Sequence, residues 1–251
     1  MRNTSLLFFC AIFLVGLMGN LRAQPHRKPE WNVGVGAMYL NRPYRGAGDR
    51  FIPLPILAYW GPRFSLLGPR AGYKLIRRKA LSLTFTTAYR FAGYDPDDSP
   101  FLQGMEKRKD TISIGLTAGY SFSHQIKTEL RYEMDALSRN HGKQVTLEIS
   151  KSFQRQRWSV SPSAGLVYQD ANLTDYYYGV GPAESRSNRP AFGGKDSLNQ
   201  TLGLSLRHRL NQRTTLMAGV TLEYLNQKIT DSPIINKNHR STTRAGLLYR
   251  F

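Results

Sequence analysis

Apolar and polar residues alternate with a period of two along most of the chain. Between residues 126 and 137 the even positions are mostly apolar and the odd positions mostly charged, so one face is apolar and the other charged. The same alternation recurs in 111–122, 158–168, 201–207 and 216–224. Alternation of this kind indicates half-buried β-strands, and no segment after residue 30 shows a convincing helical period. The sequence therefore predicts an all-β protein.

Spacing of these segments predicts about 12 strands. The third and fourth are short and flanked by proline, so ten strands is the alternative. The predicted ranges are 32–40, 51–60, 63–68, 70–77, 80–91, 110–122, 125–137, 143–153, 157–169, 198–210, 213–225 and 240–251.

Long and short connections alternate along the chain. The long ones are 41–50, 92–109, 170–197 and 226–239, whereas the others are mostly tight turns such as 77–79 and 211–212. Alternation places the long loops at one end of the molecule, as in outer-membrane barrels. The predicted fold is a transmembrane, antiparallel, up-and-down β-barrel.

Aromatic residues near the strand ends support this fold. Tyr39, Tyr89, Tyr168 and Tyr224 form one expected ring on the apolar parity, and a second ring lies at the opposite ends. The second ring comprises Trp31, Trp60, Tyr120, Phe122, Phe153, Trp158, Tyr249 and Phe251. A soluble β-sandwich is the alternative, but its core would be apolar, whereas the opposite faces here carry charge.

Those charges predict a polar barrel interior. Charged side chains away from water need partners or a solvated lumen. We expect them to brace the barrel as a cross-strand network, with an ion pathway as the other possibility. The predicted network is Glu129, Arg131, Glu133, Glu148 and Arg207.

The N-terminus predicts export. Arg2, the apolar run 6–18 and the small residue Ala23 match a signal peptide over 1–23, followed by a periplasmic arm at 24–31 and the barrel at 32–251. The net charge of +18 favours an anionic partner, and export together with the lack of a nucleic-acid-binding motif argues against nucleic acid. The single cysteine, Cys10, excludes a disulfide framework.

The C-terminus has the pattern of a barrel assembly signal. A final amphipathic strand ending in an aromatic residue provides an edge that can be paired when the barrel closes. The residues that carry this pattern are Arg244, Gly246, Tyr249 and Phe251.

Several stretches resemble the MipA/OmpV family across residues 32–251. The segment TDYYYGV resembles the hallmark loop of that family, and 231–234 with the chain ending resembles its last hairpin. Further similarity lies in 43–44, 53–55, 93–96, 102–108 and 189–192. The family-loop residues are Thr174, Asp175, Tyr176, Tyr177, Tyr178, Gly179, Val180 and Glu184.

The resemblance implies a bacterial outer-membrane barrel in contact with membrane lipid and lipopolysaccharide. It also implies a scaffold in murein synthesis that holds a lytic transglycosylase and a penicillin-binding protein together. The tyrosines of the family loop either form a contact surface or fold the loop down as a plug.

Catalytic chemistry has little support in the sequence. The five histidines lack metal-ligand spacing, and neither a cofactor motif nor a metal site is expected. Asp231, Ser232 and His239 share a loop and form the best available enzyme constellation. We interpret them as ordinary loop residues and predict a protein that is not an enzyme.

Two function classes remain open. A scaffold would dock partners through basic turns, and a narrow channel or surface receptor (an adhesin, for example) would use the polar lumen and large loops. The basic turns are also consistent with plain solvated turns. The candidate docking residues are Arg77, Arg78, Lys79, Arg155 and Arg157.

Overall fold

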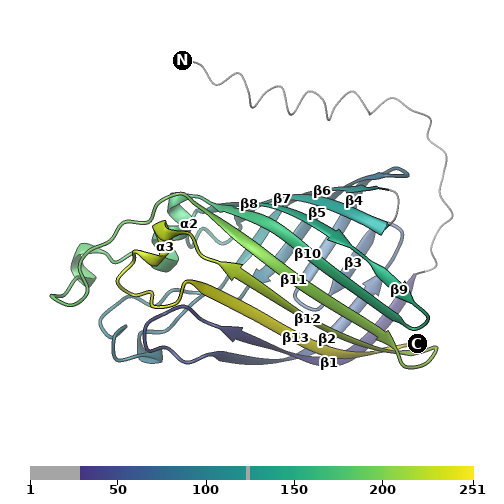
Figure 1. The fold of residues 1–251 in the computed structure, drawn as a ribbon, viewed down its shortest axis with the longest axis horizontal. Coiled ribbons are helices and arrows are strands. Elements are labelled where there is room, and N and C mark those ends of the chain that lie inside the picture. Colours follow the sequence, from purple (N-terminus) through teal and green to yellow (C-terminus); the bar gives the residue numbers. More distant parts are fainter. Residues whose placement is uncertain (1–28, 123–124) are drawn as a thin grey trace, which may run out of the picture.

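A computed structural model describes residues 29–122 and 125–251 as a β-barrel capped by loops (Figure 1). The predicted signal peptide and most of the predicted arm lie outside these residues. The strands are β1 (Glu30–Asn41), β2 (Arg50–Trp60), β3 (Phe64–Leu67), β4 (Arg70–Arg77), β5 (Leu81–Arg90), β6 (Thr111–Ser121), β7 (Ile126–Asp135), β8 (Lys143–Lys151), β9 (Phe153–Arg155), β10 (Trp158–Gln169), β11 (Ser197–Arg209), β12 (Thr214–Tyr224) and β13 (His239–Arg250).

Each strand pairs antiparallel with its neighbours, and β10 pairs with β11 to close the sheet. Both β8 and β9 pair with β10 in a single register, since Ser150 faces Ser163 and Phe153 faces Val160. This register places Lys151 opposite Pro162, which has no amide hydrogen for the ladder, so one strand is divided in two. The described residues therefore form a barrel of 12 strands, which confirms the predicted fold and count.

The two ends of the barrel differ in their connections. We call the end with the long connections the loop end, and the end with the tight turns and the chain's C-terminus the turn end (Figure 1). Short helices occur at the loop end: η1 (Pro96–Asp98), α2 (Ala171–Tyr178), η3 (Pro182–Glu184) and α3 (Gln227–Thr230). No helix in the described part of the chain is long and apolar enough to cross a membrane.

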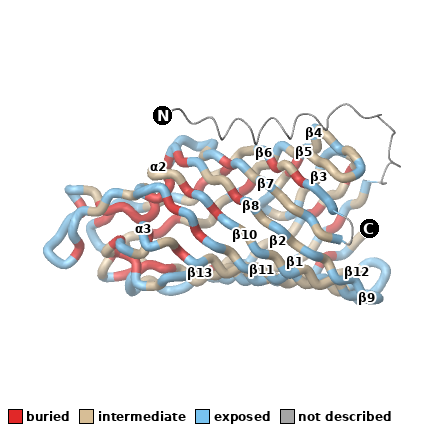
Figure 2. Tube along the Cα trace, turned by 45° about the horizontal axis from the view of Figure 1, so that its top comes forward, coloured by how far each residue is buried: buried red, intermediate tan, exposed pale blue. Residues whose placement is uncertain are grey.

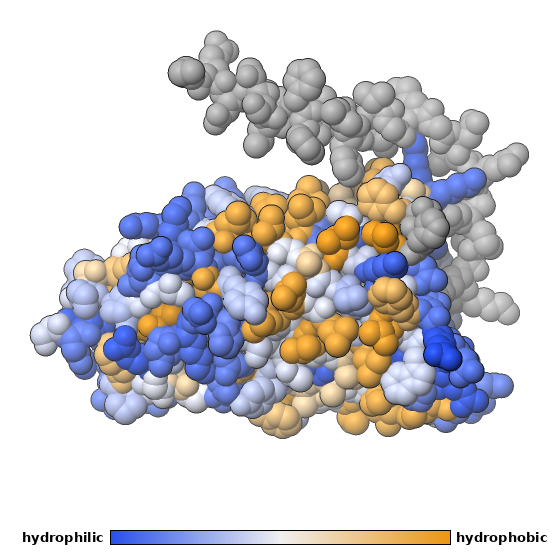
Figure 3. Space-filling view, in the orientation of Figure 1, coloured by the Kyte–Doolittle hydropathy of each residue, from blue (hydrophilic) through white to orange (hydrophobic). Residues whose placement is uncertain are grey.

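Apolar side chains point outward from the strands. Leu116, Leu147, Leu202 and Val220 are among the large hydrophobic residues that remain exposed in mid-strand. Hydrophobic surface covers the strands in Figure 3, whereas hydrophilic surface covers the loop end. An exposed apolar band between two polar ends is the surface that a lipid bilayer requires.

The prediction that Trp60 belongs to the second aromatic ring was wrong. Trp60 pairs with Glu30 in the register of β1 with β2 and lines a cavity inside the barrel, whereas Tyr59 points outward and contacts Trp31 with ring centroids 4.6 Å apart. The strand β2 is apolar at both parities, so alternation could not assign its faces.

Candidate functional site

The four largest connections at the loop end pack into a single cover, which we call the lid. The lid comprises residues 42–49, 91–110, 170–196 and 225–238. It contains most of the buried hydrophobic residues of the described chain, which Figure 2 shows gathered at that end. The lid core consists of Tyr44, Tyr94, Leu102, Met105, Leu173, Tyr177, Tyr178, Val180, Leu225, Ile229, Ile234 and Ile235.

The family loop forms a central part of the lid. Asp170 caps helix α2 by accepting a hydrogen bond from the amide of Leu173 at 3.0 Å. Thr174, Tyr177 and Tyr178 point into the lid and are buried, whereas Asp175 on the opposite side is exposed. This packing favours the plug interpretation for the two buried tyrosines. The Tyr176 hydroxyl accepts a hydrogen bond from the backbone amide of Lys109 at 2.9 Å. Gly179 ends the helix, and Val180 forms an isolated β-bridge with Phe192.

A buried ion pair joins two lid segments that are far apart in sequence. Both carboxylate oxygens of Glu184 accept hydrogen bonds from the Arg108 guanidinium, at 2.9 and 3.0 Å. They also accept hydrogen bonds from the backbone amides of Glu106 and Gly181. Burial raises the pKa of the nearby Tyr94 hydroxyl to about 12. Every lone-pair direction of the buried carboxylate is thus used, which is the condition for a buried charge to be tolerated.

Arg189 strengthens the same junction without a salt-bridge partner among the described residues. Its side chain is almost fully buried and donates to the carbonyl oxygens of Phe101, Gln103 and Glu184. Apart from the resemblance of the segment 189–192 to the family, no feature of the sequence indicated this role.

The predicted lumen network is only partly assembled. Arg131 lies 3.8 Å from Glu129, Lys127 lies 2.5 Å from Glu129, and Glu148 faces Glu129 across the β7–β8 pair. Glu133 is buried and accepts from the Ser113 hydroxyl at 3.1 Å. Arg207 lies apart from them at the turn end. Sequence reasoning missed Arg70, which points into the lumen and adds a further positive charge near Arg131 and Glu133.

A second lumen network joins the barrel to the lid. The Arg240 guanidinium donates to Glu223 at 2.8 and 3.0 Å and to the Tyr178 hydroxyl at 3.2 Å. Asn199 also donates to Glu223, at 2.7 Å. The lid therefore rests on polar and charged side chains of three adjacent strands, β11, β12 and β13.

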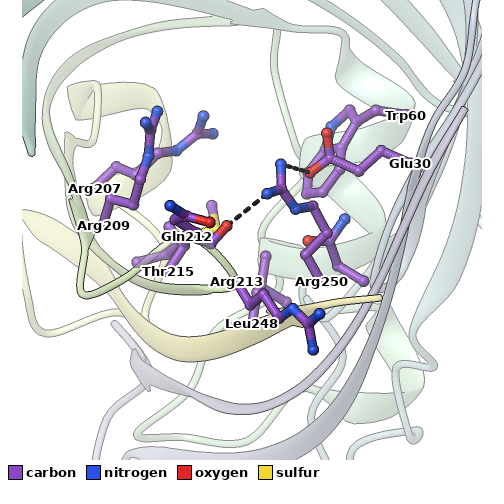
Figure 4. A pocket seen from close by; sticks show the side chains of 11 residues that line it. Glu30, Trp60, Arg207, Arg209, Gln212, Arg213, Thr215, Leu248 and Arg250 are labelled. Atoms are coloured by element: carbon purple, nitrogen blue, oxygen red, sulfur yellow. Dashed lines mark hydrogen bonds and ion pairs between the residues drawn. The ribbon is translucent and has the colours of Figure 1, made fainter. Parts of the chain in front are cut away.

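A basic cavity of about 350 Å³ opens inside the turn end (Figure 4). Arg207 and Arg209 project into it from β11, and Arg250 projects from β13 and donates to the Gln212 carbonyl at 2.7 Å. Glu30 is the only acidic residue of the lining and lies 3.9 Å from Arg250. The guanidinium groups of Arg207 and Arg209 have no hydrogen-bond or ion-pair partner among the described residues. The alternation of inward and outward residues at the turn ends of β11 and β13 could have identified this arginine cluster from the sequence.

The candidate docking residues all lie at the turn end. Arg77 ends β4, and Arg78 and Lys79 form the turn to β5. Arg155 ends β9, and the Arg157 guanidinium donates to the carbonyl of Leu210 at 3.1 Å. The structure thus brings these residues to one end of the barrel, where their docking role stays a prediction.

The predicted assembly signal lies in the last strand. Arg244 and Gly246 point into the lumen, and Gly246 faces Gly36. A Cβ atom at Gly36 would lie 2.6 Å from the backbone carbonyl oxygen of Ala245, so that position needs glycine, whereas a Cβ atom at Gly246 would first meet the end of the Ile56 side chain, at 2.7 Å. Tyr249 and Phe251 point outward at the turn end, and the Tyr249 hydroxyl accepts from Arg213 at 3.1 Å.

The loop residues weighed as an enzyme site do not form a catalytic arrangement. The buried Ser232 hydroxyl donates to the carbonyl of Tyr178 at 2.5 Å, and His239 contacts the neighbouring Asn238 side chain. In the described ranges, moreover, no three histidine, cysteine or acidic side chains gather as metal ligands.

Comparison with known proteins places this geometry in a family. Residues 33–251 match the family described as "MltA-interacting protein MipA". The chain is 28% identical to the "Putative outer membrane protein YiaT" of Escherichia coli (strain K12), over 96% of this chain and 97% of that protein. It is 25% identical to the "MltA-interacting protein" of the same organism, over 90% and 92% of the two chains.

Among solved structures, a NanC porin covers 88% of this chain and 100% of its own, with a TM-score of 0.43 and 8% identity. The family match spans nearly the whole described barrel, and the relatives are named as outer-membrane proteins. The lid therefore faces the cell exterior and the turn end faces the periplasm. The chain belongs to the MltA-interacting protein (MipA) family of bacterial outer-membrane β-barrels, as the resemblance of its sequence predicted.

Proposed function

We propose that this protein is a non-enzymatic scaffold that holds periplasmic murein enzymes at the outer membrane. The partners we expect are a murein lytic transglycosylase and a penicillin-binding protein. A relative that is 25% identical carries the name "MltA-interacting protein", which supports the first of these. The observation that carries the proposal is the distribution of charge between the two ends of the barrel.

External connections are neutral and periplasmic turns are basic. The segments 42–49, 91–110, 136–142, 170–196 and 225–238 together hold eleven basic and eleven acidic residues. The turns 61–63, 78–80, 122–125, 156–157 and 210–213 hold five basic residues and no acidic residue. A one-signed surface steers an oppositely charged partner and sets its orientation. The periplasmic end is therefore the surface we expect an acidic partner to bind.

The basic cavity extends this surface into the barrel. Arg207 and Arg209 offer guanidinium groups that have no partner within the described chain. Such groups bind carboxylates through paired hydrogen bonds. An acidic segment of a partner could insert there without displacing an existing ion pair.

The lid argues against a wide pore. Its buried core covers the external end, and the Arg240–Glu223 pair fixes it to the barrel wall. A narrow channel is the second candidate function, because the cavity inside the turn end is lined by several arginine residues. The Ser232 hydroxyl is buried and donates its hydrogen bond to the carbonyl of Tyr178, which supports the non-enzymatic assignment.

Affinity capture tests the proposal. Tagged protein from detergent-solubilised envelopes should recover a lytic transglycosylase and a penicillin-binding protein. Charge reversal at Arg77, Arg78 and Lys79 should weaken this capture at least severalfold, because it removes basic charge from the docking surface. The barrel should stay intact, because the turn lies outside the membrane. The matched control reverses Arg139, Lys195 and Lys228, which are exposed at the loop end, and should capture as the wild type does.

Planar-bilayer recording separates the two candidate functions. Silent or very small currents together with captured partners support the scaffold. Large, stable, anion-selective currents with no murein enzyme recovered would establish the channel instead.

A further inference from the structure

Over residues 50–56, strand β2 has a paired strand on one side only. On one side β2 pairs with β1 along its full length, from Arg50 to Trp60. On the other side its pairing with β3 covers only 58–60, and a hydrogen bond from the amide of Gly68 to the carbonyl of Leu57 ends the contact. The β3–β4 hairpin turns back at that height. Among the described residues, no strand pairs with this edge of β2 between 50 and 56.

Two prolines lie on this open edge. In a strand, residues two apart direct their amide and carbonyl groups to the same side. Since the carbonyl of Leu57 points toward β3, the backbone groups of Phe51, Pro53 and Pro55 also face the open edge. Proline has no N–H group, so two donors that would otherwise lack a partner are absent. The same absence prevents a further strand, including one from a second copy, from completing a ladder there.

The open edge lies at the depth of the outer leaflet. Phe51 faces Tyr39 in the register of β1 with β2, at the level of the external aromatic ring. Tyr59 contacts Trp31 at the periplasmic ring. The unpaired part of β2 therefore begins at the external ring and ends near mid-membrane. Hydrocarbon is what surrounds a barrel wall at this depth.

Both faces of this segment are apolar, unlike the other strands. Phe51, Pro53, Pro55 and Leu57 point toward lipid and are exposed. Ile52, Leu54 and Ile56 point into the lumen and remain partly accessible. The glycines at 36 and 246 give the Ile56 side chain room to lie against the wall. An apolar stripe inside the lumen thus adjoins the unpaired edge.

Side chains, rather than a ladder, join the two borders of the gap at its external end. The Arg50 guanidinium lies 3.1 Å from Asp110 and 5.9 Å from the centre of the Phe91 ring. On the β5 side, the amide of Tyr89 donates to the carbonyl of Pro69 at 2.9 Å, which ties the β3–β4 turn to β5 close to the external aromatic ring. Arg50 and Asp110 therefore act as a latch across the top of the gap.

We propose that the gap between β2 and β5, above the β3–β4 hairpin, is a lateral portal that admits an acyl chain from the outer leaflet into the lumen. The acyl chain lies against Ile52, Leu54 and Ile56. Arg50, at the top of the portal, is placed to hold an anionic headgroup. This portal is independent of the proposed scaffold role, since it uses the opposite half of the barrel.

Spin labelling tests the portal. A nitroxide is attached to Leu54→Cys in a Cys10→Ser background, and the full-length protein is placed in vesicles of phosphatidylethanolamine and phosphatidylglycerol. Collision rates with oxygen, which partitions into lipid, and with a water-soluble nickel chelate are compared. Thr201→Cys is the lumen control on a fully paired strand, and Leu202→Cys is the lipid-facing control.

The portal predicts an oxygen-to-nickel ratio at position 54 that is severalfold above the ratio at 201 and close to that at 202. A ratio equal to that at 201 overturns the proposal, as does low collision with both reagents, which would mean that protein fills the gap. Ile52→Cys repeats the measurement should Leu54→Cys fail to fold.

A latch variant supplies an independent readout. Arg50→Ala should raise the oxygen collision rate at position 54, whereas Arg42→Ala, which breaks the Arg42–Asp98 ion pair of the lid, should leave that rate unchanged. An equal response of the two variants would show that Arg50 does not close the portal.

Discussion

At the scale of single residues, the lid depends on one carboxylate. Glu184→Ala removes the buried partner of Arg108, whose side chain is 11% exposed, and leaves this buried guanidinium with only the exposed Glu106 as a counter-charge. Breaking a buried pair in this way costs about 3–5 kcal/mol. We expect limited proteolysis to cut 91–110 and 170–196 readily in this variant, while the barrel keeps its heat-modifiable mobility on gels.

Glu106→Ala is the matched control. Glu106 also pairs with Arg108, at 3.3 Å, but its side chain is 85% exposed. Exposed pairs contribute from about 0 to 1 kcal/mol, so this variant should resist proteolysis as the wild type does. Equal sensitivity of the two variants would show that burial of Glu184 does not secure the lid.

At the scale of elements, close packing of adjacent strands requires glycine at particular positions. A Cβ atom at Gly115 in β6 would lie 1.8 Å from the carbonyl oxygen of Tyr132 in β7. Gly115→Ala should lower the free energy of unfolding by about 1–3 kcal/mol, because the two backbones must separate. Gly219→Ala is the control, since its nearest contacts would be 3.3 Å away. Urea unfolding in detergent measures both variants, and equal losses would contradict the prediction.

The last strand carries a separate prediction about assembly. Phe251→Asp should sharply reduce the yield of folded barrel, because the terminal aromatic group of β13 is lost. A charge at the interface by itself costs on the order of 1 kcal/mol. Leu210→Asp introduces a charge at the same end, following β11, and should reduce the yield much less. Wild-type yield for Phe251→Asp would show that the chain ending is not the assembly signal.

At the scale of the whole molecule, the lid should be the part that responds to acid. A hydrogen bond from Lys107 holds the pKa of Asp95 below its ordinary value. Burial raises the pKa of Asp98, but hydrogen bonds from Arg42 and the amide of Asp95 lower it by more. Lowered values mean that the ionised forms stabilise the lid above about pH 4, and that this stabilisation is lost as pH falls through the folded-state values.

Pepsin cleavage of 91–110 should therefore be faster at pH 2 than at pH 4, after correction for pepsin activity on an unstructured peptide. Asp98→Asn removes one titrating group and should reduce the difference between the two pH values. A cleavage rate that does not change with pH in the wild type would contradict this account.

Alternation of apolar and polar residues by itself predicted the strands and, with the lengths of the connections, the gathering of the long loops at one end of the barrel. The period of two works because a barrel strand meets lipid on one face and the lumen on the other. Arg207, for example, was correctly expected to point inward, since its neighbours at 206 and 208 face lipid.

Only the tertiary structure decided what happens where strands or loops from distant parts of the chain meet. It placed Trp60 in the lumen, because β2 is apolar on both faces and carries no alternation to read. It joined Arg108 to Glu184 across 76 residues, since irregular loops have no period that would predict a contact. It also left the edge of β2 unpaired, because the β3–β4 hairpin is too short to extend the ladder beyond residue 58.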